Sequence, residues 1–425
     1  MRVWPTGGLW RHPDFLKLWS AETISQFGSQ VGQLALPLVA VIVLESSAFE
    51  VAALTTIMFL PFILFTLPAG VWVDRTRRRP ILIAGDFGRL VLLATVPIAY
   101  AFDAVTIWQL YVVGFLYGVC TVFFDVAYQS YLPSLVARDQ LIEGNSKLEI
   151  SRSASQMAGP GLGGILVQVL TAPYALLVDA ISFLGSGLFL LCIRRTEQLP
   201  EREDDAPHPS MFREAREGLG YVLGNRYLRS IAACTGISNF ATSLAFAVFL
   251  VYAVRELELS PAAIGIVFSI SSVGSLAAAL TATRLSSRLG VGPTIVGSAF
   301  VFAPPLFLIA AAPPSAPIPF LVAAFVLFGY GAVIYNITQI SFRQAICPER
   351  MQGRMNSVMR FIVWGVMPIG SLLGGALATW IGLRETMWVG AAIGVFAFVP
   401  VLFSPVRKLR EMPEPIDDIP EPAVA

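Results

Sequence analysis

The sequence predicts an all-α polytopic membrane protein, with twelve transmembrane helices in two pseudo-symmetric six-helix bundles. Composition is the first reason. Of the 425 residues, 56% are hydrophobic and only 13% are charged, whereas soluble domains carry about 25% charged residues. A soluble fold would leave this much apolar surface open to aggregation. The apolar runs and the distribution of Lys and Arg along the chain are the second and third reasons.

Twelve stretches of the chain are long and apolar enough to be transmembrane helices, which need about 20 mainly apolar residues. The eighth and eleventh are the least hydrophobic. The stretches cover approximately residues 17–44, 50–73, 80–101, 106–131, 143–170, 173–193, 229–254, 262–284, 293–312, 318–341, 355–380 and 385–404.

The basic residues between these stretches predict the orientation of the chain. Alternating sides along the chain, one side receives nearly all Lys and Arg, and the other receives only Arg255 and Arg384. Because cytoplasmic loops carry the excess of Lys and Arg, we expect both termini in the cytoplasm and the protein in the plasma membrane. Residues 1–13 lack an apolar core, so we expect no cleavable signal peptide.

A polar segment divides the chain into domains. We expect an N-terminal bundle over 1–194, a cytoplasmic linker over 195–228, a C-terminal bundle over 229–405 and a disordered acidic tail over 406–425. Within the linker, residues 211–223 have their apolar side chains on one helical face. Two placements of this helix stay open: on the inner membrane surface, or packed on the protein.

The two halves contain matching residues at a constant offset of 211 positions. Asn145 and Ser146 match Asn356 and Ser357, and a set of glycines follows in each half. The glycines are Gly159, Gly163 and Gly164 in the first half and Gly370, Gly374 and Gly375 in the second. Two six-helix repeats related by an axis along the membrane normal are typical of a major class of secondary transporters.

The loop between the second and third stretches carries a dense charge cluster, Gly70-Val71-Trp72-Val73-Asp74-Arg75-Thr76-Arg77-Arg78-Arg79-Pro80. It resembles the loop motif G-x-x-x-D-R-x-G-R-R of the major facilitator superfamily. Arg77 replaces the usual glycine of that motif. A similar replacement is seen in the drug- and siderophore-exporter branch, which includes enterobactin and macrolide exporters. The resemblance extends over essentially the whole ordered chain and implies a secondary transporter.

The resemblance also implies a conformational latch, meaning a contact made in one conformation and broken in another. Its residues are Gly70, Asp74, Arg75, Arg78, Arg79 and Asp125. A carboxylate such as Asp74 is stabilised at a helix N-terminus, and the family places this target near residues 353–356. The family likewise pairs Arg78 with an acid of the fourth stretch, where Asp125 is the candidate. The alternative is a simple anchor of topology through positive charge.

Gly159-Pro160-Gly161-Leu162-Gly163-Gly164 resembles the end of the family's antiporter motif, although Ser155 stands in place of its upstream glycine. Glycine faces let helices approach closely, and Pro160 permits a bend. The resemblance implies that this bend helps to close the outer face. Close packing of small residues alone is the alternative explanation.

Ionisable residues inside the predicted spans are candidate functional residues. Glu22 has no partner in its own helix and is our candidate proton carrier, with a salt bridge at the cytoplasmic end as the alternative. Asp86 and Arg89, three residues apart, are expected to pair with each other. Glu149 and Arg360 occupy equivalent repeat positions with opposite charge, which suggests an inner gate.

Neutral polar and aromatic residues in the spans form a candidate substrate cavity between the two halves. Such a lining suits large amphiphilic ligands, although hydrogen bonding between helices explains any single member equally well. The candidates are Gln26, Gln30, Gln33, Gln156, Asn239, Tyr335, Asn336, Gln339 and Trp364.

Together these features predict a secondary active transporter that exports a drug-like or natural-product small molecule by alternating access, with protons as the coupling ion. Uptake of a small metabolite and a non-transporting membrane sensor or scaffold are the alternatives. We expect a monomer with the lipid bilayer, substrate and protons as partners. We expect no enzymatic activity, cofactor, metal or nucleic-acid partner, because no nucleophile–base pair, metal-ligand cluster or basic tract occurs.

The latch hypothesis predicts that Asp74→Asn impairs transport but leaves expression and topology nearly intact. The substitution removes a charge from a conformational switch and not from the hydrophobic core. Transport assays on membranes with matched protein levels check this. Normal transport by the variant would reduce the charged loop to an orientation signal.

Overall fold

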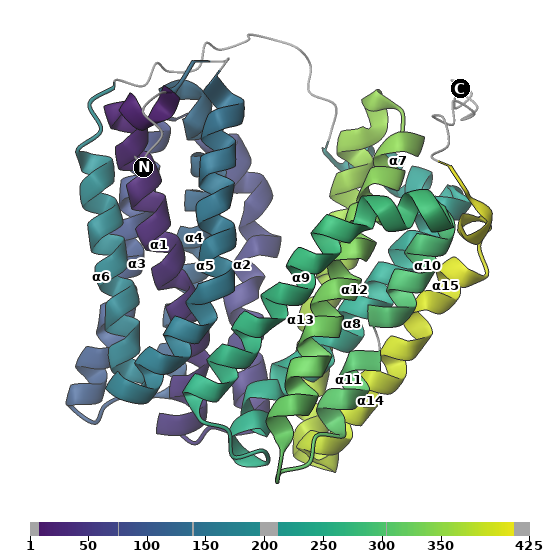
Figure 1. Ribbon diagram of the computed structural model, residues 1–425. Coiled ribbons are helices and arrows are strands. Elements are labelled where there is room, and N and C mark those ends of the chain that lie inside the picture. Colours follow the sequence, from purple (N-terminus) through teal and green to yellow (C-terminus); the bar gives the residue numbers. More distant parts are fainter. Residues whose placement is uncertain (1–7, 75, 138–139, 196–210, 303, 412–425) are drawn as a thin grey trace, which may run out of the picture. The chain divides into compact units, whose positions relative to one another are not determined.

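The computed structural model describes residues 8–74, 76–137, 140–195, 211–302 and 304–411, and all regular structure in them is helical. The chain forms two compact units (Figure 1). The first unit comprises Met1–Asp204 and Leu250–Ser269, and the second comprises Asp205–Phe249 and Ile270–Ala425. The prediction of an all-α polytopic fold is confirmed.

The first unit is built mainly from six long helices. Within it α1 packs against α5 and α6, α2 against α4, and α3 against α4 and α6. The helices are α1 (Pro13–Leu38, extended by the π-helical turn η2, Val39–Val43), α2 (Ala48–Asp74), α3 (Arg78–Ala101), α4 (Ile107–Leu135), α5 (Leu141–Leu170) and α6 (Ala172–Leu191).

The second unit contains most of the remaining helices, and residues 250–269 of α8 and α9 belong to the first unit. In the second unit α10 packs against α12, α11 against α12 and α14, and α13 against α7 and α14. The helices are α7 (Met211–Gly224), α8 (Arg226–Arg255), α9 (Pro261–Leu289), α10 (Val291–Phe302), α11 (Pro304–Ala310), α12 (Pro317–Ile346), α13 (Glu349–Ile381), α14 (Leu383–Val395) and α15 (Val399–Leu402).

Eleven helical segments of the described residues are long and apolar enough to cross a membrane, and α5 is the exception. Its 30 residues suffice in length, but its first half carries Glu143, Lys147, Glu149 and Arg152. The sequence marked the eighth and eleventh stretches as the weakest, yet α9 and α13 both meet the criterion. The expectation about the weakest span was therefore wrong, because the uncharged second half of α5 is itself rich in Ser, Gln, Gly and Pro and so has a lower hydropathy than α9 or α13.

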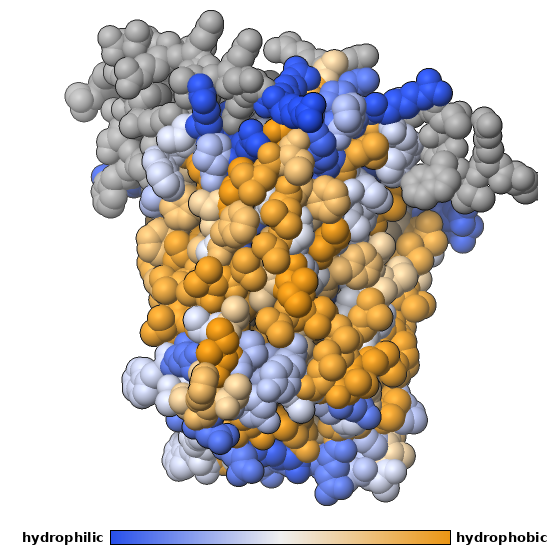
Figure 2. Space-filling model, turned by 90° about the vertical axis from the view of Figure 1, so that its left-hand side faces the viewer, coloured by the Kyte–Doolittle hydropathy of each residue, from blue (hydrophilic) through white to orange (hydrophobic). Residues whose placement is uncertain are grey.

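The surface of the protein fits a lipid environment. Figure 2 shows a face with a broad apolar band between two hydrophilic ends. Large hydrophobic residues are exposed on this surface. Val91 on α3 is 63% exposed, and Leu188 on α6 is 50% exposed. Contiguous apolar surface of this kind is typical of membrane contact.

Helix α7 packs on the second unit. Val222 is fully buried in the core of that unit, and the Glu217 carboxylate forms an ion pair of 2.8 Å with Arg354 of α13. Gly218 lies so close to α13 that an added Cβ would be 3.0 Å from the Arg354 carbonyl oxygen. Of the two placements left open by the sequence, the structure shows the helix packed on the protein, with Leu223 on its exposed side.

The repeated glycines close a helix pair in each unit. In the first unit, Gly159 and Gly163 of α5 face α1, where added Cβ atoms would lie 2.5 Å from Gln30 Cβ and 3.1 Å from Val31 Cα. Contacts this short leave no room for a side chain. The close approach of the two helices therefore requires glycine at 159 and leaves little space at 163.

In the second unit, Gly370 and Gly374 of α13 take the same role against α8. An added Cβ at Gly370 would be 2.6 Å from the Phe240 carbonyl oxygen, and one at Gly374 would clash with the Leu244 backbone. The repeat therefore extends from sequence to three-dimensional contact. In each half, glycines of the fifth membrane helix allow it to pack closely against the first.

A further glycine contact lies on another face of α5. An added Cβ at Gly164 would clash with the Pro261 carbonyl oxygen, and Gly265 Cα lies 3.0 Å from the same position. The Gly161 amide donates a hydrogen bond of 2.8 Å to Ser269 Oγ. The end of the glycine-proline motif thus packs on the part of α9 that belongs to the first unit.

The glycine contacts predict that Gly374→Ala destabilises the second unit, whereas Gly365→Ala does not. Both positions lie on α13, but nothing lies within 4 Å of a Cβ added at Gly365. Overpacking costs about 1–3 kcal/mol, while alanine in an open helical position gains up to about 1 kcal/mol over glycine. Thermal unfolding of both purified variants checks this, and equal stabilities would contradict it.

Candidate functional site

A cavity of about 1290 Å³ lies within the first unit. Ligand pockets typically enclose about 300–1,000 Å³, so this cavity has room for a large organic molecule. Its walls come from α1, α2, α4 and α5, with Arg89 from α3. The lining includes Glu22, Ser25, Gln26, Ser29, Gln30, Gln33, Thr55, Met58, Phe59, Phe62, Arg89, Tyr117, Thr121, Phe124, Asp125, Tyr128, Asn145, Glu149, Arg152 and Gln156.

Helix α1 forms a polar wall. Glu22, Gln26, Gln30 and Gln33 all line the cavity, and their spacing of four, four and three residues places them on one helical face. The four were candidate functional residues from the sequence, and the structure brings them together. Buried residues such as Leu18, Ala21 and Leu36 of the same helix lie in the packed interior.

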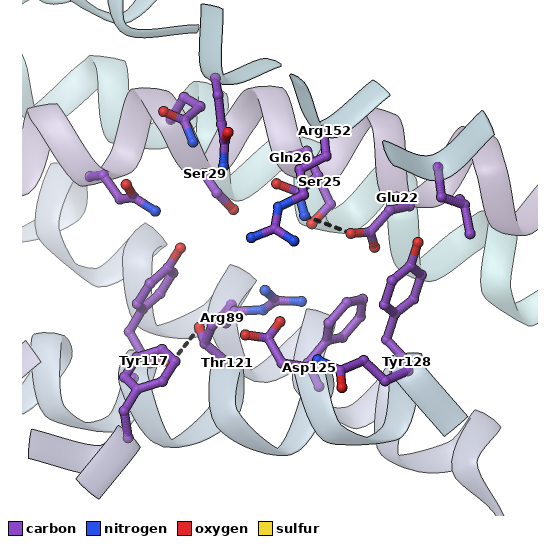
Figure 3. Close-up of a pocket in the computed structure, with 18 of the residues that line it drawn as sticks. Glu22, Ser25, Gln26, Ser29, Arg89, Tyr117, Thr121, Asp125, Tyr128 and Arg152 are labelled. Atoms are coloured by element: carbon purple, nitrogen blue, oxygen red, sulfur yellow. Dashed lines mark hydrogen bonds between the residues drawn. The ribbon is translucent and has the colours of Figure 1, made fainter. Parts of the chain in front are cut away.

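Helix α4 forms the opposite wall. Tyr117, Thr121, Phe124, Asp125 and Tyr128 line the cavity, and Figure 3 shows several of these side chains facing those of α1. The sequence identified only Asp125 among them. The signal was present in the spacing of three and four residues between polar-tipped aromatic and hydroxyl side chains, which places them on one face.

Helices α2 and α5 complete the lining in different ways. Thr55, Met58, Phe59 and Phe62 of α2 give the cavity an apolar wall. The sequence did not identify them, because α2 is apolar all round and its periodicity marks no face.

On α5, the predicted residues Gln156 and Glu149 both line the cavity. Glu149 Oε2 lies 3.9 Å from Arg152 Nη1 on the same helix, and both side chains are exposed. The gate partner suggested by the repeat, Arg360, lies in the second unit, where its guanidinium is 5.0 Å from the centroid of the Trp364 ring. The gate stays a prediction.

Arg89 is a buried cation at the cavity wall. Its Nη2 is 2.5 Å from Asp86 Oδ1, and the two side chains are 3% and 0% exposed. Its guanidinium also lies 4.2 Å from the ring centroids of both Phe124 and Phe183. The predicted pairing of Asp86 with Arg89 is confirmed. Rings on a cation add attraction that grows when the group is desolvated.

Glu22 of α1 is a buried acid at the cavity wall. Its side chain is 6% exposed, and Oε1 accepts a hydrogen bond of 2.6 Å from Gln26 Nε2. Oε2 has no hydrogen-bond partner in the part of the chain that the structure describes. Asp125 and Arg89 line the same cavity, and the Tyr128 hydroxyl points towards Glu22 (Figure 3).

Asp179 of α6 occupies a tight contact with α1. Its carboxylate lies so close to Gly28 and Gly32 that a Cβ at either glycine would clash with it. Ser182 Oγ donates a hydrogen bond of 3.2 Å to Oδ1. Asp179 therefore lies outside the cavity lining and packs α6 against α1.

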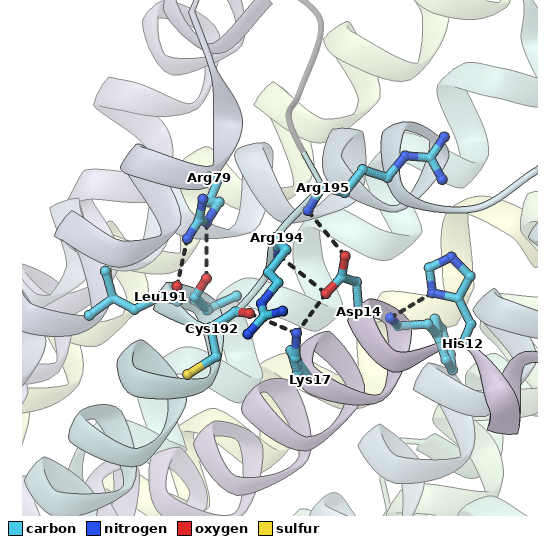
Figure 4. Close-up of polar contacts among 10 residues, drawn as sticks. His12, Asp14, Lys17, Arg79, Leu191, Cys192, Arg194 and Arg195 are labelled. Atoms are coloured by element: carbon cyan, nitrogen blue, oxygen red, sulfur yellow. Dashed lines mark hydrogen bonds and ion pairs between the residues drawn. The ribbon is translucent and has the colours of Figure 1, made fainter.

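The charged loop joins other elements at one end of the first unit (Figure 4). Arg79 donates hydrogen bonds to the carbonyl oxygens of Leu190 (3.0 Å) and Leu191 (2.7 Å) at the end of α6. A cation at a helix C-terminus satisfies free carbonyls and complements the helix dipole. Arg79 therefore caps α6.

A second cluster in Figure 4 ties the start of α1 to the end of α6. Asp14 accepts hydrogen bonds from the backbone amides of Arg194 (3.2 Å) and Arg195 (3.1 Å). Lys17 Nζ lies 2.8 Å from Asp14 Oδ1 and 2.7 Å from the Cys192 carbonyl oxygen. The sequence gave no indication of this contact between residues about 180 positions apart.

The latch is described only in part. The side chain of Asp74 and residue Arg75 lie outside the described residues, and a Cβ at Gly70 would meet nothing within 4 Å. Among the described residues, no ion pair joins Asp125 to Arg78, and Asp125 lines the cavity. The latch stays a prediction.

The remaining cavity candidates lie in the second unit, where several of them form hydrogen bonds within or between helices. Asn239 Nδ2 of α8 donates a hydrogen bond of 3.0 Å to the Val363 carbonyl oxygen of α13. The Tyr335 hydroxyl lies 2.7 Å from Thr235 Oγ1. Gln339 Nε2 donates a hydrogen bond of 3.4 Å to Asn336 Oδ1 within α12. Hydrogen bonding between helices, the alternative from the sequence, thus accounts for Asn239 and Tyr335 in this structure.

Comparison with known proteins gives full-length matches. The family model for transmembrane secretion effectors matches residues 8–425. The multidrug efflux pump Tap of Mycolicibacterium fortuitum is 28% identical, over 95% of this chain and 97% of that protein. Macrolide efflux protein A of Streptococcus pyogenes is 23% identical, over 93% of this chain and 97% of that protein.

Solved structures share the fold at low sequence identity. A bacterial homologue of the iron transporter ferroportin, in its inward-facing state, has a TM-score of 0.74 at 17% identity and covers 93% of this chain and 99% of that one. The nucleoside transporter NupG has a TM-score of 0.75 at 12% identity, over 92% and 98% of the two chains. These two matches concern the fold alone.

The buried pair predicts that Asp86→Asn destabilises the first unit, because it leaves the Arg89 charge buried beside a neutral group. Removing one member of a buried pair costs about 3–5 kcal/mol. The double variant Asp86→Asn/Arg89→Gln removes both charges and is expected to recover most of this loss. Thermal unfolding of the purified single and double variants measures the difference. A double variant no more stable than Asp86→Asn would contradict this account of the pair.

Proposed function

Because this chain belongs to the transmembrane secretion effector family of the major facilitator superfamily, we propose that it exports drug-like or natural-product molecules by proton antiport and alternating access. The observation that carries the proposal is the cavity of the first unit, whose walls combine neutral polar and aromatic side chains with a few charged ones, among them the buried acid Glu22. Two of its relatives are a multidrug efflux pump and a macrolide efflux protein, which supports export.

The lining of the cavity supports amphiphilic substrates. Gln26, Gln30 and Gln33 offer both donors and acceptors without fixed charge, and the wall across from them presents Tyr117 and Phe124. Aromatic and amide groups accept many shapes of partly apolar molecule, whereas a single small metabolite calls for a more closely fitted site. A multidrug or macrolide-like substrate range follows from this chemistry.

The acid in the cavity supports proton coupling. Ionising a carboxyl group inside a low-dielectric helix bundle is costly. A change in the surroundings of Glu22 therefore changes how readily this residue releases its proton. Substrate entering beside Gln26 alters the hydrogen bond that Glu22 accepts. We propose that proton release from Glu22 and substrate binding are linked in this way, with Arg89 and Asp125 setting the local charge.

Everted membrane vesicles test direction and coupling. We expect uptake of a fluorescent cationic drug into everted vesicles when an inward-acid pH gradient is imposed, and loss of uptake when nigericin removes the gradient. Uptake that is independent of the pH gradient would contradict coupling to protons. Accumulation in whole cells that rises on expression would favour the uptake permease, and no transport of any compound would favour the sensor.

Orientation and oligomeric state are part of the same proposal. The distribution of Lys and Arg supports cytoplasmic termini in the plasma membrane, and the protein is proposed to act as a monomer. Alkaline phosphatase fused after the C-terminus should be inactive, whereas a fluorescent protein fused there should be bright. An active phosphatase fusion would contradict the orientation.

The role of Glu22 predicts that Glu22→Gln lowers gradient-driven efflux at least about tenfold, because amides do not exchange protons in this range. The matched control is Glu45→Gln, the same substitution at an exposed residue of the first unit. Substrate binding by Glu22→Gln should persist. Initial rates in everted vesicles at equal protein levels measure the effect, and unchanged gradient-driven transport would exclude Glu22 as the carrier.

A further inference from the structure

A second hollow, of about 430 Å³, lies at one end of the second unit and carries a concentrated positive charge. Arg226 and Arg229 contribute from the start of α8, and Arg407 and Lys408 contribute from the 3-10 turn η5 (Pro405–Lys408). All four side chains are exposed. The start of the first membrane helix of the second unit and the turn after its last membrane segment therefore meet around a basic hollow.

These four cations have no acidic partner in the part of the chain that the structure describes. No Asp or Glu lines the hollow, and none of the ion pairs recorded for the described residues involves them. Like charges held together repel one another, so an anion that enters the hollow is favoured by all four. Arginine pairs of this kind suit phosphate oxygens in particular.

The rim of the hollow is apolar and open. Phe403 lines it with 77% of its side chain exposed, and Pro400 lies one helical turn before it. An apolar ring left exposed beside the end of a membrane segment offers a surface for the hydrocarbon chain of a lipid. Apolar contact beside four cations matches a ligand that has both a phosphate and a hydrocarbon chain.

From this arrangement we propose that the hollow binds the headgroup of an anionic phospholipid, with its phosphodiester among Arg226, Arg229, Arg407 and Lys408 and an acyl chain along Phe403. Basic pockets at the cytoplasmic ends of transmembrane helices recognise such headgroups. The bound lipid would bridge the first and last membrane segments of the second unit. The site shares no residue with the cavity of the first unit and does not include the acid of the proposed transport.

Lipid titration of the purified full-length protein tests the site. Native mass spectrometry compares binding of phosphatidylglycerol with that of phosphatidylcholine of the same acyl chains. Phosphatidylglycerol is expected to bind more tightly, and Arg226→Gln/Arg229→Gln to weaken it about 25-fold, at about fivefold for each cation lost. The control Arg284→Gln/Arg288→Gln removes the same charge at exposed positions of α9 outside the hollow.

Arg229 Nη1 also donates a hydrogen bond of 3.4 Å to the Leu223 carbonyl oxygen, so its substitution could disturb the start of α8. A second variant separates this effect from the loss of charge. Arg407→Gln/Lys408→Gln changes the opposite wall and should weaken binding to a similar degree. Equal binding of the two lipids, or equal loss in the α9 control, would overturn the proposal. If inorganic phosphate displaces the lipid at a concentration similar to that of the lipid, the hollow is a site for a free anion and the proposal is wrong.

Discussion

The placement of charge in a bundle that faces lipid is the constraint on which the first unit depends. A charge buried without a partner costs several kcal/mol, so ionisable groups must pair or face a water-accessible cavity. Arg89 meets this condition through Asp86 and the rings of Phe124 and Phe183. Asp125 meets it by facing the cavity. The cavity and the pair are thus two consequences of one requirement.

Close helix packing makes this arrangement possible. Gly159 and Gly163 bring α5 against α1, and this contact places Gln156 and Gln30 in the same cavity lining. Gly370 and Gly374 repeat the contact between α13 and α8 in the second unit. The sequence repeat therefore preserves a packing geometry, while the side chains that give chemistry differ: the first unit carries the buried acids, and Arg360 of the second stacks on Trp364.

Sequence reasoning succeeded where a residue type has few options in a membrane. Charges at membrane depth, such as Glu22 and Asp86, had to be inside, and polar residues of α1 at helical spacing had to share a face. It failed where hydrophobic periodicity does not distinguish one side of a helix. Because α2 is apolar all round, its sequence does not show which residues face the cavity. The capping of α6 by Arg79 depends on tertiary contact and has no local sequence signature. The fifth predicted stretch, 143–170, coincides closely with α5, although its charged first half makes it less hydrophobic than the other long helices.

The central claim is that binding of substrate and loss of a proton from Glu22 are coupled within one cavity. Proton release by the purified protein in weakly buffered detergent solution, followed with a pH-sensitive dye, measures this coupling without a membrane gradient. Adding a compound that the vesicle assay shows to be transported should release protons from the wild-type protein and none from Glu22→Gln. Binding of that compound without proton release by the wild-type protein would contradict the account.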